Sequence, residues 1–264
     1  MCATCGCGDD GATVTVPGHV HPHENGHPHH HHDHDHVHTE TITLEQKVLA
    51  KNDELADENR AWLAERDILA FNLTSSPGAG KTTLLERTIR DLCADRPVAV
   101  IEGDQETLLD AERIKAAGAN AVQVNTGAGC HLDAAMVHRA LQTLDPEPGS
   151  LLFIENVGNL VCPALFDLGE RSKVVVISVT EGDDKPLKYP HMFAAAGLVI
   201  VNKIDLLPYV SFDLEKSRGY VRSLNPDAQI LTMSAITGDG TAQWYEWIED
   251  CANSASSVTS VDKT

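Results

Sequence analysis

The amino-acid sequence predicts an α/β fold: a parallel sheet of about seven strands with helices on both of its faces. Short runs rich in β-branched residues alternate with stretches of helical periodicity, which is typical of strands joined by crossover helices. Several of these runs, such as KVVVISV and GLVIV, are apolar almost throughout, as expected of strands that are buried on both faces.

The predicted elements follow one another from residue 43 onward. Thr43 to Gln46 can form a capping box, and apolar residues at helical spacing predict a first helix up to about Arg66. Residues 254–264 lack apolar periodicity, so we expect a flexible tail after a domain that spans residues 41–253. Strands are predicted at 68–73, 98–101, 121–124, 151–154, 174–179, 198–201 and 229–233.

The composition limits the classes of function. The chain has 264 residues, and its hydrophobic fraction of 42% is ordinary for a globular protein. No apolar run approaches the roughly 20 residues of a membrane span, and the N-terminus shows no secretory signal pattern, so we expect a cytoplasmic protein without membrane contact. The formal net charge of −19 disfavours nucleic acid as a partner and favours divalent cations.

Residues 1–40 differ from the rest of the chain. Eleven of the fourteen histidines lie between His19 and His38, where Asp, Pro and Gly interrupt them and apolar residues are few. We expect this segment to be disordered without metal, and its imidazoles suit Ni2+, Zn2+ and Cu2+. An expression tag is the alternative, but the histidines of a tag usually form an uninterrupted run. The segment therefore predicts storage or capture of metal.

Three of the seven cysteines lie at the very start of the chain. Cys2, Cys5 and Cys7 form a C-x-x-C-x-C motif in which three sulfurs can bind one ion without a folded core. In a cytoplasmic chain such cysteines indicate metal ligands rather than disulfides. We predict a second N-terminal metal site here.

The segment TSSPGAGKTT, residues 74–83, predicts a phosphate-binding loop. It follows a predicted strand and precedes a helical run, the context in which the G-x-x-x-x-G-K-[ST] motif is meaningful, although Ser75 replaces the first glycine. Lys81 can neutralise the β and γ phosphates, and Thr82 can place its hydroxyl on Mg2+. An ordinary strand–turn–helix is the bland alternative. The nucleotide-binding residues predicted here are Ser76, Gly78, Ala79, Gly80, Lys81, Thr82 and Thr83.

The segment NKID, residues 202–205, predicts that the nucleotide is a guanine nucleotide. Guanine offers two hydrogen-bond donors on one edge, and the carboxylate of Asp205 can accept both. Asn202 and Lys203 complete the motif after a predicted buried strand, and Ser234 and Ala235 follow another strand and would flank the base. The alternative is that Asp205 merely begins a turn.

Two acidic residues at predicted strand ends complete a magnesium site. Asp104 follows VAVIEG and Glu155 follows LLFI, so either can hold Mg2+ directly or through water, together with Thr82. We predict Lys81 and Asp104 as the catalytic residues. A solvated loop carboxylate is the alternative for each acid.

A further metal site is predicted from Cys130, His131 and Cys162. Thiolate and imidazole ligands suit Zn2+ or Ni2+, although a buried cysteine is more often a small core residue. Loops that follow the strands of a parallel sheet emerge at one edge, so these residues are expected on the same side as the phosphate loop. Nucleotide and metal would then be linked through residues 155–163.

These motifs together resemble the HypB family, GTPases that help to insert nickel into [NiFe] hydrogenases. The resemblance covers about residues 41–249 and rests on SSPGAGKTTLL, IEGDQETLLDAERI, NTGAGCHLDA, ENVGNLVCPA and NKIDLLPYVSFD. The family keeps serine where Ser75 stands. CATCGC resembles a high-affinity metal motif that some members have, and the histidine tract resembles a nickel-storing segment of others.

The resemblance implies a phosphate-loop fold of the SIMIBI class, slow Mg2+-dependent hydrolysis of GTP to GDP, and a homodimer promoted by GTP and metal. It places the site of Cys130, His131 and Cys162 at the dimer interface. It also implies a HypA-type nickel metallochaperone and the hydrogenase large-subunit precursor as partners.

Three other functions fit parts of the sequence. A urease-type nickel GTPase has a Cys-Pro-His motif, whereas Cys162-Pro163 is followed here by Ala164. A non-enzymatic nickel or zinc storage protein would use only the N-terminal segment. An ATP-dependent kinase is disfavoured by the NKID segment.

Overall fold

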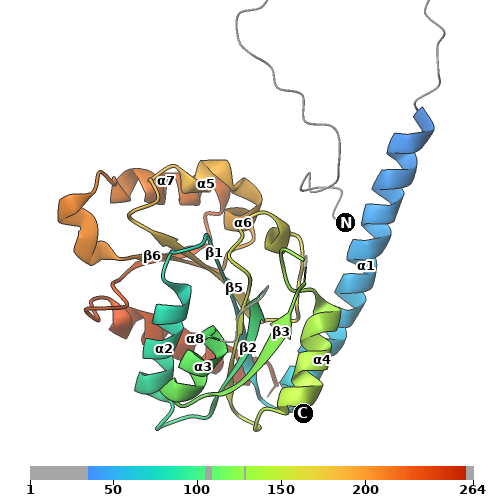
Figure 1. The fold of residues 1–264 in the computed structure, drawn as a ribbon, viewed down its shortest axis with the longest axis horizontal. Helices are drawn as coiled ribbons and strands as arrows, with labels where there is room; N and C mark the ends of the chain where they lie inside the picture. The colour runs from blue at the N-terminus through green and yellow to red at the C-terminus, as the bar shows by residue number, and fades with distance from the viewer. Residues whose placement is uncertain (1–34, 105–108, 128, 260–264) are drawn as a thin grey trace, which may run out of the picture. The chain divides into compact units, whose positions relative to one another are not determined.

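A seven-stranded, fully parallel sheet forms the centre of the described chain, which in this computed structural model comprises residues 35–104, 109–127 and 129–259. The strand order is β3-β2-β4-β1-β5-β6-β7. This confirms the predicted fold class (Figure 1). The strands are β1 (Leu69–Ser75), β2 (Val98–Asp104), β3 (Asn120–Asn125), β4 (Leu151–Glu155), β5 (Ser172–Ser178), β6 (Leu198–Asn202) and β7 (Gln229–Thr232).

Helices connect the strands. The described residues from Lys51 onward form one compact unit, and those up to Ala50 belong to another. The α-helices are α1 (Asp35–Glu65), α2 (Lys81–Leu92), α3 (Leu109–Ala117), α4 (Ala134–Leu144), α5 (Lys185–Lys188), α6 (Pro190–Ala194), α7 (Leu214–Leu224) and α8 (Thr241–Thr259). Two short 3-10 helices are η1 (Cys162–Ala164) and η2 (Ile204–Tyr209).

Both faces of the sheet are buried, because side chains alternate between them along each strand. One face packs Phe71 and Phe153 against α2, α3 and α8, which lie together on one side of the sheet in Figure 1. The other face packs Ile101 and Ile154 against α4, and Val175 and its neighbours against α6 and α7. This double burial explains why the strands are apolar throughout.

The first helix differs from the prediction. It begins at Asp35 rather than at Thr43, so Thr43 to Gln46 lie inside the helix and do not cap it. A capping box only marks where a helix can begin, and helical hydrogen bonding continues upstream here. At the other end of the chain α8 extends to Thr259, beyond the expected domain limit of residue 253. No helix of the described residues is long and apolar enough to cross a membrane.

Trp244 of α8 is the largest fully buried side chain of the core. Its indole Nε1 donates to Thr88 Oγ1 at 2.9 Å, and its ring lies against Phe71 and Phe153. We expect Trp244→Ala to lower the free energy of unfolding by about 3–5 kcal/mol, because it leaves a cavity and removes the hydrogen bond that Thr88 Oγ1 accepts. Denaturant unfolding measures this. Tyr209→Ala is the control, because that side chain is 83% exposed and should change stability by less than about 0.5 kcal/mol. Equal losses in the two variants would contradict the expectation.

Candidate nucleotide and metal sites

The predicted site residues gather at the carboxyl edge of the sheet. Asp104, Glu155 and Asn202 are the last residues of β2, β4 and β6, and all strands point the same way. Ligands of open α/β sheets bind at this edge. The strands predicted from the sequence end one or more residues before Asp104, Glu155 and Asn202.

The phosphate loop joins β1 to α2. Gly78 has φ 77° and Gly80 has φ 95°, a left-handed conformation that favours glycine. Ser75 is the last residue of β1 and pairs with Val176. Its backbone is that of a strand, so no glycine is required at the position where the usual motif begins with one. Lys81, Thr82 and Thr83 form the first turn of α2, whose N-terminus favours an anion.

Glu155 is bound to the phosphate loop. Its Oε1 accepts hydrogen bonds from Lys81 Nζ and Thr82 Oγ1, each at 2.7 Å. Its other oxygen, Oε2, is buried and receives no hydrogen bond within the described part of the chain. A hydroxyl beside a carboxylate with a spare oxygen suits Mg2+. Asp104, the third predicted magnesium ligand, ends β2, but its side chain is not among those described.

Ser76 connects the phosphate loop to the segment that follows β5. Its hydroxyl donates to Glu181 Oε2 at 2.8 Å and accepts from Lys185 Nζ at 3.1 Å. Lys185 also forms an ion pair with Glu181. Nothing in TEGDDK marks Glu181 and Lys185 locally, so the sequence does not predict this contact.

The NKID segment holds the phosphate loop through the side chains of Asn202 and Lys203. Asn202 Nδ2 donates to the Ala79 carbonyl at 2.9 Å, and Lys203 Nζ donates to the Gly78 carbonyl at 2.6 Å. Asp205 Oδ1 is buried, and among the described residues no donor binds it. This orphaned acceptor fits recognition of a base edge that carries donors.

Ser234 and Ala235 lie beside this segment. Asn202 Oδ1 accepts from the backbone amide of Ala235 at 3.1 Å, so the side chain of Asn202 joins the phosphate loop to the loop after β7. Ser234 is fully buried, and its Oγ accepts from the amide of Thr237.

Cys130, His131 and Cys162 meet, although they come from two different loops. The ligand atoms of the three lie within 4.8 Å of one another, and the two sulfurs are 2.7 Å apart. Cys162 is 4% exposed. Burial lowers the pKa of the His131 imidazole, with the Asp133 carboxylate opposing that shift, so the neutral, metal-binding form is favoured at neutral pH. The donor set fits Ni2+ or Zn2+.

Asn156 connects Glu155 to the loop that carries Cys130 and His131, a role that the sequence does not predict. It follows Glu155 directly, and its Oδ1 accepts from the backbone amide of Leu132 at 3.1 Å. Leu132 is the residue after His131. Nearby, Asn159 Nδ2 donates to the Cys130 carbonyl at 3.2 Å, and its Oδ1 accepts from the amide of Val161. The segment after β4 therefore carries Cys162 and also contacts the loop that carries Cys130 and His131.

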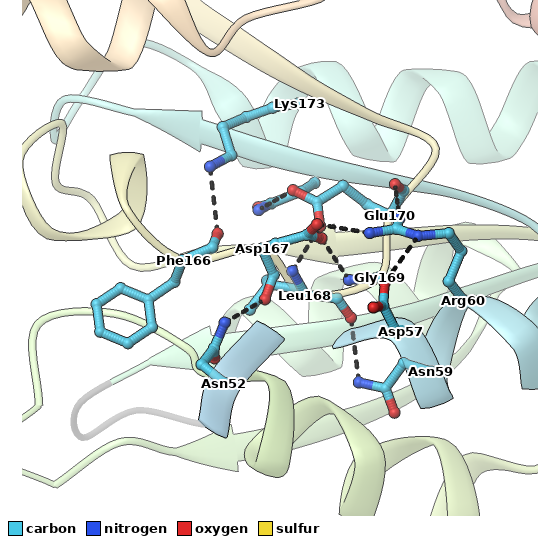
Figure 2. A network of polar contacts seen from close by, with 11 residues as sticks. Asn52, Asp57, Asn59, Arg60, Phe166, Asp167, Leu168, Gly169, Glu170 and Lys173 are labelled. Carbon is cyan, nitrogen blue, oxygen red and sulfur yellow. Dashed lines mark hydrogen bonds and ion pairs between the residues drawn. The ribbon is translucent and has the colours of Figure 1, made fainter. Parts of the chain in front are cut away.

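A polar network that includes the buried side chains of Glu170 and Lys173 is shown in Figure 2. Glu170 accepts from Asn72 Nδ2 at 3.0 Å and from the Leu168 amide at 2.7 Å. Lys173 donates to the backbone carbonyls of Pro163, Ala164 and Phe166. Burial lowers the pKa of Lys173, with the charge of Glu170 opposing that shift, and burial raises the pKa of Glu170, with Lys173 opposing it. A lysine directly before the apolar run VVVISV is the sequence feature that could have indicated this buried network.

Comparison with known proteins agrees with this geometry. Residues 69–232 match the profile of the family described as CobW/HypB/UreG, nucleotide-binding domain. The hydrogenase maturation factor HypB of Escherichia coli strain K12 is 58% identical over 208 residues, which cover 79% of this chain and 72% of that protein. This chain belongs to the HypB family of hydrogenase maturation factors.

Two solved HypB structures extend the comparison. HypB of Archaeoglobus fulgidus is 41% identical, with a TM-score of 0.71, over 77% of this chain and 99% of that one. HypB of Helicobacter pylori, solved in complex with nickel, is 40% identical, with a TM-score of 0.69, over 77% of this chain and 92% of that one. The resemblance to HypB found in the sequence is thereby confirmed.

Not every predicted site residue of this HypB chain can be placed. Cys2, Cys5 and Cys7 and the histidines from His19 to His34 lie outside the described residues. His36 and His38 belong to the first turns of α1, but the structure describes side chains only from Gln46 onward. The N-terminal metal sites therefore remain predictions.

Proposed function

We propose that this chain is a metal-regulated GTPase that carries nickel during the maturation of [NiFe] hydrogenase. The observation that carries the proposal is the path from Lys81 and Thr82 through Glu155 and Asn156 to Leu132, beside the metal group. A nucleotide phosphate must meet Lys81 and Thr82, so GTP binding changes the contacts of Glu155. Asn156 passes that change to the backbone that bears the metal ligands.

The roles of the groups follow from their positions. Lys81 neutralises the β and γ phosphates, the amides around Gly78 and Gly80 bind their oxygens, and Asp205 selects guanine. Magnesium, held by Thr82, Asp104 and Glu155, would supply further charge neutralisation at the phosphates. GTP hydrolysis relaxes the contacts of Glu155, and the ligand geometry at Cys130, His131 and Cys162 then favours release of the nickel cargo.

The wider assembly belongs to the same proposal. Residues 1–40, with Cys2, Cys5, Cys7 and the histidines, capture or store nickel, and the domain of residues 41–253 binds GTP. The active form is a cytoplasmic homodimer promoted by GTP and metal. A HypA-type metallochaperone exchanges nickel or zinc with it, and the hydrogenase large-subunit precursor receives the nickel. Membership of the HypB family supports these partners.

A residue-specific nickel titration tests the proposal. We expect Ni2+ to protect Cys130 and Cys162 of the full chain from alkylation, read by mass spectrometry of their peptides. The half-protecting Ni2+ concentration should differ at least about 5-fold between samples with Mg2+ and GDP and samples with Mg2+ and a non-hydrolysable GTP analogue. That factor is the low end of the change in affinity that allosteric coupling typically gives. Light scattering of the same samples follows dimer formation.

Asn156→Ala should remove the dependence on nucleotide, because Leu132 loses the side chain that ties it to Glu155. Asn120→Ala is the matched control, since Asn120 begins β3 at the opposite edge of the sheet. Superimposed titrations with the two nucleotides in the unmodified chain would contradict the switch and favour a non-enzymatic storage protein. Activation of a urease precursor but not of a hydrogenase precursor would favour the urease-type alternative.

A further inference from the structure

The turn that carries Cys162 is held from its buried side by one lysine. Lys173 Nζ donates to the carbonyl oxygens of Pro163, Ala164 and Phe166 at 2.7, 3.4 and 3.2 Å. An ammonium has three donors and no acceptor, so these three carbonyls satisfy it. Figure 2 shows the side chain of Lys173 directed toward Phe166. The turn is thereby fixed to the start of β5.

Lys173 also acts on the other half of the metal group through Phe166. The ring centroids of Phe166 and His131 are 4.1 Å apart. The ammonium that holds the backbone of Phe166 therefore helps to keep an aromatic ring against the imidazole that would bind metal. The positions of the Cys162 thiol and of the His131 ring therefore both depend on the position of residues 163–166.

Asn52 of α1 ties the two ligand-bearing segments to each other. Its Oδ1 accepts from the amide of Ala134 at 2.9 Å, and its Nδ2 donates to the carbonyl of Asp167 at 2.8 Å. Ala134 lies three residues after His131, and Asp167 lies five residues after Cys162. Asn52 is buried, as is Asn59, which donates to the carbonyls of Ala134 and Leu168. Figure 2 shows both asparagines facing residues 166–169.

A stabilising role alone does not account for a buried lysine. An apolar residue of similar volume is often as stabilising as a buried charge, or more so. Two acceptors of Lys173, the carbonyls of Pro163 and Ala164, belong to the turn that begins with Cys162, and the third, that of Phe166, lies two residues beyond it. Metal ligands need their atoms within fractions of an ångström of a set geometry, and partners behind the ligands commonly supply that order.

We propose that Lys173 and Asn52 are positioning residues of the metal site, which fix the Cys162 turn and the Cys130–His131 loop at ligand distance from each other. The inference rests on the proposed metal site. It adds that the spacing of the ligands is set by β5 and α1, before any metal arrives, and not by the metal itself.

The test compares full chains by the nickel protection of individual cysteines. In Lys173→Met, the half-protecting Ni2+ concentration for Cys130 and Cys162 should rise about 10–100-fold, the range for loss of such a partner. Without metal, alkylation of Cys162 should become faster, because its turn is released. Protection of Cys2, Cys5 and Cys7 and the GTP hydrolysis rate without nickel should stay within about 2-fold of the unmodified chain.

Two further variants keep the test decisive. Asn52→Ala should also raise the half-protecting Ni2+ concentration for Cys130 and Cys162. This variant tests the proposal even if Lys173→Met fails to fold, as judged by circular dichroism and GTP binding. Lys188→Met is the matched control, because Lys188 is an exposed lysine paired with Asp184 at 2.9 Å. It should leave every half-protecting concentration unchanged.

The outcomes separate the two proposals. If nickel fails to protect Cys130 and Cys162 in the unmodified chain, the proposed metal site is wrong, and the positioning role is wrong with it. If nickel protects them there and equally well in folded Lys173→Met and Asn52→Ala, the metal site stands and the positioning role is overturned. A lower melting temperature with unchanged protection would show that these residues only stabilise the fold.

Discussion

Replacing Lys81 with alanine is expected to lower the rate of GTP hydrolysis by about 100–1,000-fold, the usual cost of one charge-stabilising group at a reacting centre. Lys81 is the first residue of α2, with its side chain 11% exposed, and its Nζ lies 2.7 Å from Glu155. In the GTP complex that ammonium would turn to the phosphates. Phosphoryl transfer depends almost entirely on such positioning and charge neutralisation.

Phosphate release in single-turnover conditions measures this effect. Lys188→Ala is the matched control, because Lys188 lies on the exposed surface of α5 and should leave the rate unchanged. Nickel protection of Cys2, Cys5 and Cys7 should be the same in Lys81→Ala as in the unmodified chain. Hydrolysis retained within about 10-fold by Lys81→Ala would remove Lys81 from the proposed mechanism.

Asp205→Asn is expected to weaken GTP binding at least about 100-fold and to improve binding of xanthosine triphosphate. In the proposed function the carboxylate accepts from both donors of the guanine edge, whereas the amide of asparagine would present a donor to one of them. Xanthine carries a carbonyl at that position, which an amide donor fits. A site built to pair with polar groups rejects a mismatched edge strongly, because buried groups are left without partners.

Competition binding with a fluorescent nucleotide measures this change of preference. Asp239→Asn serves as the control, because Asp239 lies on the loop after β7 and pairs with Thr237 rather than with the phosphate loop. A variant Asp205→Asn that keeps its preference for GTP would show that another group selects the base. Tight ATP binding by the unmodified chain would favour the kinase interpretation.

The sequence by itself determined the local features of this protein. The strands could be predicted because each is a short apolar run, and the phosphate loop because strand, glycines, Lys81 and helix are contiguous. Asp205 was found in the same way, as part of a four-residue motif after a strand. Such features depend on neighbouring residues, so one stretch of sequence contains the whole signal.

The tertiary structure alone decided which distant side chains meet. Cys130 and Cys162 are 32 residues apart, Lys81 and Glu155 are 74 apart, and Asn52 and Ala134 are 82 apart. These pairs depend on the strand order β3-β2-β4-β1-β5, which places β4 between β2 and β1. Periodicity predicts that a strand is buried but does not say which strand lies beside it, and for that reason the roles of Asn156 and Lys173 emerged only from the folded chain.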